Sequence, residues 1–280
     1  MRTLLGSPDA LSDMGFFDEL DERIQATDSI VSVGLDADLD RVPESVMDAD
    51  LPRWAFNRRI IDATHEHAAC YKPNAAFYED ADGWRALAET VAYAHGKGVP
   101  VLLDAKRADI GNTARKYSEI LDLVDAITVN PYLGQDALAP FLQRESKGIF
   151  ILCRTSNPGG ADLQNERLAS GERVYERIAD RAMAWNEHGN VGLVVGATAP
   201  EELESIRERV PDVPFLVPGV GAQGGDHEAA ATYGLAGGVG LVNSSRGIIF
   251  AGENATNPDQ YFGAAGEATK RLKRNLNQYR

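Results

Sequence analysis

Short apolar runs alternate with longer amphipathic segments along this chain, and the alternation repeats eight times. The runs are rich in Val, Ile, Leu and Ala, as strands are when both faces of a parallel sheet are buried. The runs predicted to be strands are Ile30–Asp36, Ala69–Asn74, Val99–Lys106, Ala126–Asn130, Gly148–Arg154, Val191–Gly196, Phe215–Gly219 and Gly238–Asn243.

The amphipathic segments have apolar residues three and four positions apart, which is the spacing of one helix face. A helix is also predicted at Phe16–Thr27, before the first strand. The other predicted helices are Trp54–Ala68, Gly83–His95, Thr113–Val124, Val174–Glu187, Glu201–Val210 and Asp259–Asn277.

Eight strand–helix units within 280 residues are typical of a closed (β/α)8 barrel, the TIM barrel. We therefore predict an α/β fold of this kind with an extra N-terminal helix, and an open, doubly wound sheet is the alternative. No linker or change in composition divides the chain, so residues 1–280 are predicted to form a single barrel domain. The polar segment Gly159–Arg173 is predicted to be a surface loop or a small lid.

The chain carries 28 Lys and Arg against 42 Asp and Glu, a net charge of −14. Such an acidic chain opposes the phosphate backbone of nucleic acid, so a small molecule is the expected partner. No stretch approaches the ~20 apolar residues of a membrane helix, and the acidic start differs from a signal peptide. We therefore expect no membrane association and a cytoplasmic location. Cys70 and Cys153 lie within apolar runs, which favours buried free thiols over a disulfide.

Polar residues gather where the predicted strands end. In a (β/α)8 barrel the carboxyl ends of the strands meet at one mouth, where the following loops form the active site. We therefore predict that these polar side chains share one cavity. They are Asp36, Lys72, Asn74, Asp104, Lys106, Asn130, Thr155, Ser156 and the residues from Asn243 to Arg246.

The segment VLLDAKRADIGN contains Asp104 and Lys106, whose side chains leave the same face of an extended strand. A structural ion pair is the alternative interpretation, but desolvating two charges is costly and apolar residues serve a core as well. A functional role is therefore favoured. Lys72 on a neighbouring strand adds a second cation and Asp109 a second anion, which predicts an alternating Lys–Asp–Lys–Asp array.

The segment PGVGAQGGD at 218–226 follows a strand and precedes a helix, so its backbone N–H groups can bind an anion. It contains GxGxxG at Gly219, Gly221 and Gly224. A dinucleotide site has an acidic residue about 20 positions further on, at the end of the next strand, but here that position is occupied by Asn243 and two serines. The loops after the seventh and eighth strands of barrels often bind phosphate, and Arg246 follows the eighth. A phosphate monoester is therefore a better prediction than NAD.

Metal and serine-nucleophile chemistry find no support in the spacing of residues. His65 and His67 lie two positions apart on a predicted helix and do not face each other, and HExxH and CxxC are absent from the sequence. The sequence also lacks the GxSxG pattern of serine hydrolases.

As a set, these motifs resemble those of the orotidine 5′-phosphate decarboxylase family. The resemblance extends from VGLDAD at 33–38 to the last predicted strand, and the DxKxxDI pattern with its following Thr is the most specific part. The forms YKPN and TSNP are similar to the longer bacterial and archaeal branch. The motifs are YKPN at 71–74, DAKRADIGNT at 104–113, TSNPGG at 155–160, PGVGAQGGD at 218–226 and SSRGI at 244–248.

The resemblance implies a homodimer of (β/α)8 barrels that converts orotidine 5′-monophosphate (OMP) to UMP and CO2, without metal or organic cofactor. This is the last step of de novo pyrimidine biosynthesis. By position, Lys106 resembles the proton donor to C6 of the pyrimidine, flanked by Asp104, with Lys72 as the outer lysine. Asp109, together with Ile110 and Thr113, resembles residues that the partner chain contributes.

The resemblance also implies a set of substrate-binding residues. Asp36 and Lys72 would bind the ribose, Ser156 would contact the pyrimidine, and Arg246 would bind the phosphate with Gln223. Asn130 and Asn243 have no clear counterpart and are kept as candidates for the pocket wall. The implied substrate-binding set is Asp36, Lys72, Ile110, Thr113, Ser156, Pro218, Gln223, Ser245 and Arg246.

The chemistry of this reaction explains the charged residues. Loss of CO2 from C6 leaves negative charge in the ring plane, where no carbonyl delocalises it, so fixed charges must stabilise it. Lys106 can do so and then protonate the carbon, while repulsion between Asp104 and the substrate carboxylate is a secondary hypothesis. Phosphate binding can close a loop, and residues 218–226 are the predicted lid.

Two other functions stay open. One is a metal-dependent sugar-phosphate decarboxylase of the same superfamily, which keeps a similar DxKxxD pattern. The other is a catalytically silent barrel that binds a nucleotide as a regulator or scaffold.

Overall fold

Eight parallel strands form the centre of the molecule. The computed structural model describes residues 14–197, 200–220 and 226–280, and its strands follow the order β2-β1-β8-β7-β6-β5-β4-β3 in one sheet. The two end strands meet through the parallel bridges Tyr71–Val101 and Asn74–Asp104, which close the sheet. The predicted (β/α)8 barrel is confirmed, and the open-sheet alternative is wrong. The strands are β1 (Val31–Gly34), β2 (Cys70–Lys72), β3 (Leu102–Arg107), β4 (Ala126–Val129), β5 (Gly148–Arg154), β6 (Val191–Val195), β7 (Phe215–Pro218) and β8 (Leu241–Ser244).

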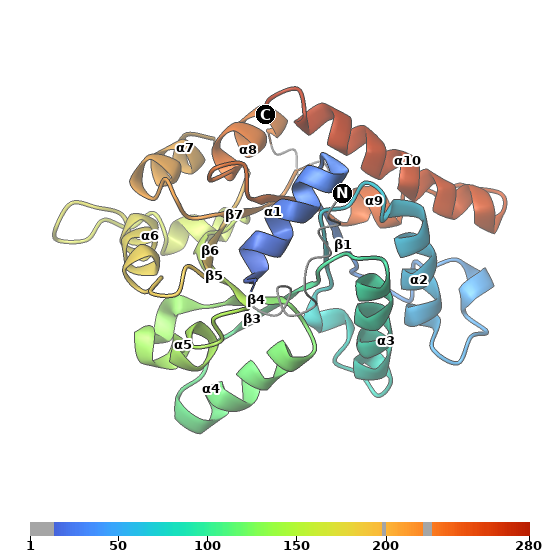
Figure 1. Cartoon of the computed structure of the whole chain (residues 1–280), viewed down its shortest axis with the longest axis horizontal. Helices are drawn as coiled ribbons and strands as arrows, with labels where there is room; N and C mark the ends of the chain where they lie inside the picture. Colours follow the sequence, from blue (N-terminus) through green and yellow to red (C-terminus); the bar gives the residue numbers. More distant parts are fainter. Residues whose placement is uncertain (1–13, 198–199, 221–225) are drawn as a thin grey trace, which may run out of the picture.

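Helices form a ring around the strands (Figure 1). Local sequence sets their ends: Pro258 occupies the first turn of α10, and the Asn257 side chain accepts a hydrogen bond from the Gln260 N–H. The α-helices are α1 (Phe16–Thr27), α2 (Pro52–Thr64), α3 (Gly83–Gly96), α4 (Gly111–Ser118), α5 (Gln135–Leu142), α6 (Val174–Ala184), α7 (Pro200–Arg209), α8 (His227–Gly234), α9 (Arg246–Ile249) and α10 (Pro258–Leu276). Short 3-10 helices are η2 (Glu44–Val46), η3 (Ala75–Phe77), η4 (Glu119–Asp122), η5 (Pro131–Leu133) and η6 (Pro158–Asp162).

Helix α1 covers the N-terminal end of the barrel and has the bounds that the sequence predicts. The Phe16 N–H donates to the Ser146 carbonyl at 3.0 Å, just before β5 begins. The Phe16 ring packs edge-on against Phe150 of β5, with 6.0 Å between the ring centroids. In Figure 1 this helix lies in front of the strands. The opposite, C-terminal end of the barrel is therefore the open mouth.

The strands are buried on both faces. Every residue of β1, β4 and β6 is buried, in agreement with the apolar runs of the sequence. Cys70 and Cys153 are free, buried thiols. Burial raises the pKa of both thiols, which makes them poor nucleophiles.

Several elements differ from the prediction. Strand β8 begins at Leu241 rather than Gly238, because Gly237 and Gly238 adopt φ angles of +58° and +95° in a turn. Helices α5 and α8, of eight residues each, were not predicted. They are short, α5 contains Pro140, and α8 is rich in alanine, so neither has a strong amphipathic period.

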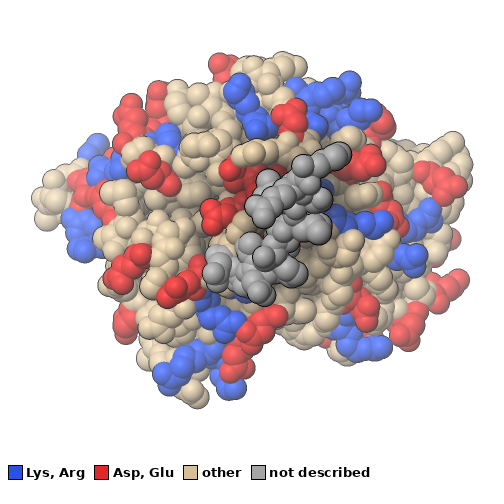
Figure 2. All heavy atoms as spheres, viewed as in Figure 1, with Lys and Arg blue, Asp and Glu red and all other residues tan. Residues whose placement is uncertain are grey.

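The molecular surface mixes both signs of charge. On the face that α1 covers, acidic and basic side chains are interspersed (Figure 2). In the part of the chain that the structure describes, no helix is both long and apolar enough to cross a bilayer.

Candidate active site

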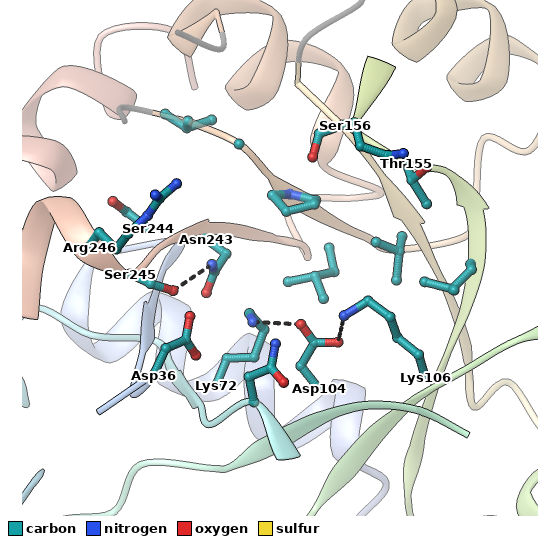
Figure 3. Close-up of a pocket in the computed structure, with 18 residues that line it drawn as sticks. Asp36, Lys72, Asp104, Lys106, Thr155, Ser156, Asn243, Ser244, Ser245 and Arg246 are labelled. Carbon is teal, nitrogen blue, oxygen red and sulfur yellow. Dashed lines mark hydrogen bonds and ion pairs between the residues drawn. The ribbon is translucent and has the colours of Figure 1, made fainter. Parts of the chain in front are cut away.

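A cavity of about 440 Å³ opens at the C-terminal mouth of the barrel, a volume usual for small-molecule sites. The ends of β1, β2 and β3 supply acidic and lysine side chains, β5 to β7 supply apolar ones, and β8 supplies hydroxyl and amide groups (Figure 3). It is lined by Asp36, Lys72, Asn74, Asp104, Lys106, Leu152, Thr155, Ser156, Asn157, Val194, Leu216, Pro218, Gly219, Val220, Asn243, Ser244, Ser245 and Arg246.

Two lysines bind the two oxygens of one carboxylate in this cavity. Lys72 Nζ lies 2.9 Å from Asp104 Oδ2, and Lys106 Nζ lies 2.6 Å from Asp104 Oδ1. The side chain of Lys72 is 4% exposed and that of Asp104 is 12% exposed, whereas that of Lys106 is 46% exposed. Lys106 is therefore the lysine of this group that is accessible to a ligand.

The charges of this group are fixed by their mutual contacts. Burial acts to raise the pKa of Asp104, but the two ammonium groups outweigh burial and hold that pKa well below its usual range. Burial acts to lower the pKa of Lys72, but the carboxylates of Asp104 and Asp36 outweigh it and raise that pKa. Asp104 and Lys72 therefore stay charged at neutral pH.

The backbone of Lys106 is not extended. Its φ is +49°, in the left-handed region, which costs a residue with a side chain on the order of 1–3 kcal/mol. The pairing of β3 with β4 shifts register between Leu103 and Arg107. The prediction that Asp104 and Lys106 lie together is confirmed, but its premise of a regular alternating strand is wrong at Lys106.

The side chain of Thr128, on β4, forms hydrogen bonds with both Asp104 and Lys106 of this irregular segment. Its hydroxyl donates to Asp104 Oδ1 at 2.9 Å and accepts the Lys106 N–H at 2.9 Å. Thr128 is not among the site residues predicted from the sequence. The only feature of the sequence that could have indicated Thr128 is that it is the one hydroxyl residue within the apolar run AITV.

Asp36 and Arg246 lie in the same cavity as the charged group. The Oδ1 atom of Asp36 is buried, and no described residue donates a hydrogen bond to it. It is therefore an acceptor for a ligand hydroxyl. Arg246 is exposed, and it lies at the opposite end of the cavity from Lys106 (Figure 3).

Two glycines allow the serines of the site to approach the barrel. A Cβ on Gly34 of β1 would lie 1.7 Å from Ser245 Oγ, and a Cβ on Gly196 would lie 2.8 Å from Ser156 Cα. Both contacts are too close for any side chain. Both serines, with Pro218, line the cavity as predicted.

The segment Gly159–Arg173 is a surface loop tied to the site. It contains most of η6 and an antiparallel bridge between Arg167 and Arg173. The Gln164 side-chain oxygen accepts the Thr155 N–H at 2.9 Å. This contact anchors the loop to the segment that carries Ser156.

Some predicted residues lie elsewhere. Asp109, Ile110 and Thr113 are outside the cavity of their own chain, at the start of α4, and the Asp109 carboxylate accepts the Ile110 N–H. Within one chain the array is therefore Lys72–Asp104–Lys106. Gln223, and with it most of the predicted lid, lies outside the described residues.

The two asparagines kept for the pocket wall have separate positions. Asn243 lines the cavity, where its side-chain oxygen accepts the Ser32 hydroxyl. Asn130 does not line this cavity; its side chain caps η5 by accepting the Tyr132 N–H.

Comparison with known proteins identifies the family. Residues 30–261 match the family described as orotidine 5′-phosphate decarboxylase / HUMPS. The chain belongs to this family. It is 72% identical over 276 residues to the orotidine 5′-phosphate decarboxylase of Halorubrum lacusprofundi, covering 95% of this chain and all of that protein. The enzyme of the same name from Dechloromonas aromatica is 43% identical over 275 residues, again 95% of this chain and all of that protein.

The fold agrees with this membership. The structure of Leishmania donovani OMP decarboxylase has a TM-score of 0.78 and 40% sequence identity, covering 94% of this chain and 99% of that chain. The family resemblance predicted from the motifs is thus confirmed. Among the described residues, no three His, Cys, Asp or Glu side chains are grouped so as to hold a metal ion.

Proposed function

We propose that this chain decarboxylates OMP to UMP and CO2, as the names of its relatives describe for those proteins. The observation that carries the proposal is the Lys72–Asp104–Lys106 group at one end of a cavity that has Arg246 at the other. A nucleotide monophosphate fits this arrangement, because its phosphate lies at one end, where Arg246 can bind it, and its reacting base at the other, beside the lysines.

The cavity offers a partner for each part of such a substrate. The guanidinium of Arg246 suits a phosphate, with which it can form two parallel hydrogen bonds. The unpaired oxygen of Asp36 suits ribose hydroxyls, and Ser156 and Pro218 suit the pyrimidine. Ile110, Thr113 and Gln223 belong to this proposed set as well. Ser245 beside Arg246 completes it.

In the proposed reaction, the bond between C6 and the carboxylate breaks and its electron pair stays on C6 as CO2 leaves. The ammonium of Lys106 stabilises that negative charge and then transfers a proton to C6. The lysine regains its proton from solvent. The net result is OMP plus one proton giving UMP plus CO2, and no redox cofactor or metal takes part in this balance.

Asp104 and Lys72 prepare Lys106 for this step. Asp104 holds the Lys106 ammonium by one oxygen, and the buried Lys72 compensates the carboxylate through the other. The charges do not have to reorganise when the carbanion forms, which is the condition for strong electrostatic stabilisation. Repulsion between Asp104 and the substrate carboxylate, relieved as neutral CO2 departs, is a secondary part of the proposal.

We further propose a homodimer in which Asp109 enters the partner's site. Within one chain both ammonium groups contact a single carboxylate, that of Asp104, so a carboxylate from the partner chain could contact the other side of the exposed Lys106. Asp109 and Ile110 stand at the surface, and Ile110 is 60% exposed. Tyr132, 80% exposed, is a further uncovered apolar side chain on η5. Apolar residues exposed to this degree favour burial between two chains.

We further propose that this reaction takes place in the cytoplasm. Fractionation of the source cells, with activity following a cytosolic marker, would support it. Activity that sediments with membranes would contradict it.

One assay tests the proposed activity. OMP is added to the purified protein in excess EDTA, and the loss of orotate absorbance is followed together with released CO2. UMP and CO2 in equal amounts support the proposal. Activity that requires a divalent metal favours the sugar-phosphate decarboxylase, and UMP binding without CO2 release favours the silent barrel.

A further inference from the structure

We propose that Thr128 is a positioning residue that holds Lys106 and Asp104 in their reactive arrangement. This inference rests on the proposed function, because it assigns to Thr128 the task of aiming the Lys106 ammonium. Thr128 lies on β4, is fully buried, and does not line the substrate cavity. It therefore acts through the two residues that it contacts.

The hydroxyl of Thr128 makes two hydrogen bonds with opposite roles. It accepts the Lys106 N–H at 2.9 Å and donates to Asp104 Oδ1 at 2.9 Å. Lys106 Nζ binds the same oxygen of Asp104 at 2.6 Å. One hydroxyl thus connects the backbone of the lysine to the carboxylate that orients its ammonium.

The irregular backbone explains why a side chain is needed here. The register of β3 against β4 shifts between Leu103 and Arg107. The Lys106 N–H therefore donates to the Thr128 side chain rather than to a backbone carbonyl of β4. Lys106 also has φ +49°, a conformation that persists only where surrounding contacts enforce it. The Thr128 hydroxyl satisfies the amide and stabilises the left-handed turn.

Loss of the Thr128 hydroxyl would therefore remove two hydrogen bonds from the site and leave the packing of the barrel core unchanged. Valine has nearly the shape of threonine, but it leaves the Lys106 N–H unpaired and removes a donor from the Asp104 carboxylate. The charged form of Asp104 would lose stabilisation, and its pKa would rise. The groups that contact Asp104 are Lys72 from β2, Lys106 from β3 and Thr128 from β4. Asp36, from the end of β1, acts on Lys72.

The test compares Thr128→Val and Thr128→Ser with wild type. For Thr128→Val we expect a kcat lower by about 10- to 100-fold, with KM changed less than about threefold, since misplacement of a catalytic group affects turnover most. Thr128→Ser keeps the hydroxyl and should restore most of the kcat.

Thr269→Val is the matched control. Thr269 is another fully buried threonine, but its hydroxyl donates to the Ala265 carbonyl within α10. Its removal should leave kcat and KM unchanged. If Thr128→Val fails to fold, Thr128→Cys, with its weaker donor, should give an intermediate loss.

A second readout is independent of turnover. At neutral pH, the NMR resonances of the Asp104 carboxyl carbon and the Lys106 amide should shift in Thr128→Val relative to wild type, because both groups lose their hydrogen bond to the hydroxyl. Failure of wild type to release CO2 would refute the proposed function, and these resonances would still decide the role of Thr128. Wild-type kcat in Thr128→Val, an equal loss in Thr128→Ser, or unchanged resonances of Asp104 and Lys106 in Thr128→Val would each overturn the inference.

Discussion

Lys72 and Lys106 bind opposite oxygens of the same carboxylate, yet the side chain of Lys72 is 4% exposed and that of Lys106 is 46% exposed. The difference separates their roles. Lys72 is enclosed and compensates the charge of Asp104, whereas Lys106 faces the cavity and can reach a substrate. The geometry therefore favours Lys106 over Lys72 as the proton donor.

Replacement of Arg246 by alanine tests the phosphate end of the cavity. For OMP, kcat/KM should fall by about 10- to 100-fold, which is the usual worth of hydrogen bonds to a charged group. For orotidine, which has no phosphate, the change should be small. Arg271→Ala, at an exposed position on α10, is the control and should change neither value. An equal loss on both substrates would remove Arg246 from the phosphate site.

Mixing two inactive variants tests whether Asp109 acts on the partner chain. A hybrid of Lys106→Ala and Asp109→Ala chains has one site with its own Lys106 and the partner's intact Asp109. Random exchange of equal amounts should then restore about a quarter of wild-type activity, because half of the dimers are hybrids with one intact site of two. Verified subunit exchange without recovery would contradict a shared site.

The pair of His95 and Asp125 predicts a pH-dependent stability. His95 Nε2 lies 2.7 Å from Asp125 Oδ2, and this hydrogen bond raises the pKa of His95 above its ordinary value. Because the pKa of His95 is raised in the folded protein, its protonated form stabilises the fold. This contribution to the free energy of unfolding is fully present below about pH 6.5 and is lost as the pH rises through the folded-state pKa. Lys147 opposes the protonated form and Glu19 favours it.

The measurement is the free energy of unfolding of wild type and His95→Gln at pH 6 and pH 8.5. The variant should be less stable than wild type at both pH values, and the difference in free energy should be larger at pH 6 than at pH 8.5. The same comparison in an Asp125→Asn background should lose this pH dependence. A margin that grows toward pH 8.5 would contradict the assignment.

The sequence predicted the barrel well because each strand is a buried apolar run and each polar cluster follows one. It also placed Asp36, Lys72, Asp104 and Ser156 at one mouth, since parallel strands share a direction. Short helices such as α8 were missed because eight residues rarely carry a clear period. The single-domain interpretation of residues 1–280 stays a prediction.

The left-handed backbone of Lys106 and the role of Thr128 could not be predicted from the sequence. A register shift between two strands depends on how both pack, and no local signal marks it. Thr128 was visible only as a polar residue in a buried strand, which is a pattern with many structural explanations. The interface that would bring Asp109 to a second chain is likewise not a property of one sequence segment.

The most direct test of the central claim is the rate of CO2 release from saturating OMP by Lys106→Ala, with UMP affinity measured in parallel. We predict a loss of about 10⁴-fold or more, since the variant lacks both the proton donor and the charge that stabilises the carbanion, while UMP still binds. Lys270→Ala, at an exposed position on α10, should be fully active. A Lys106→Ala protein that keeps most of its turnover would contradict the account.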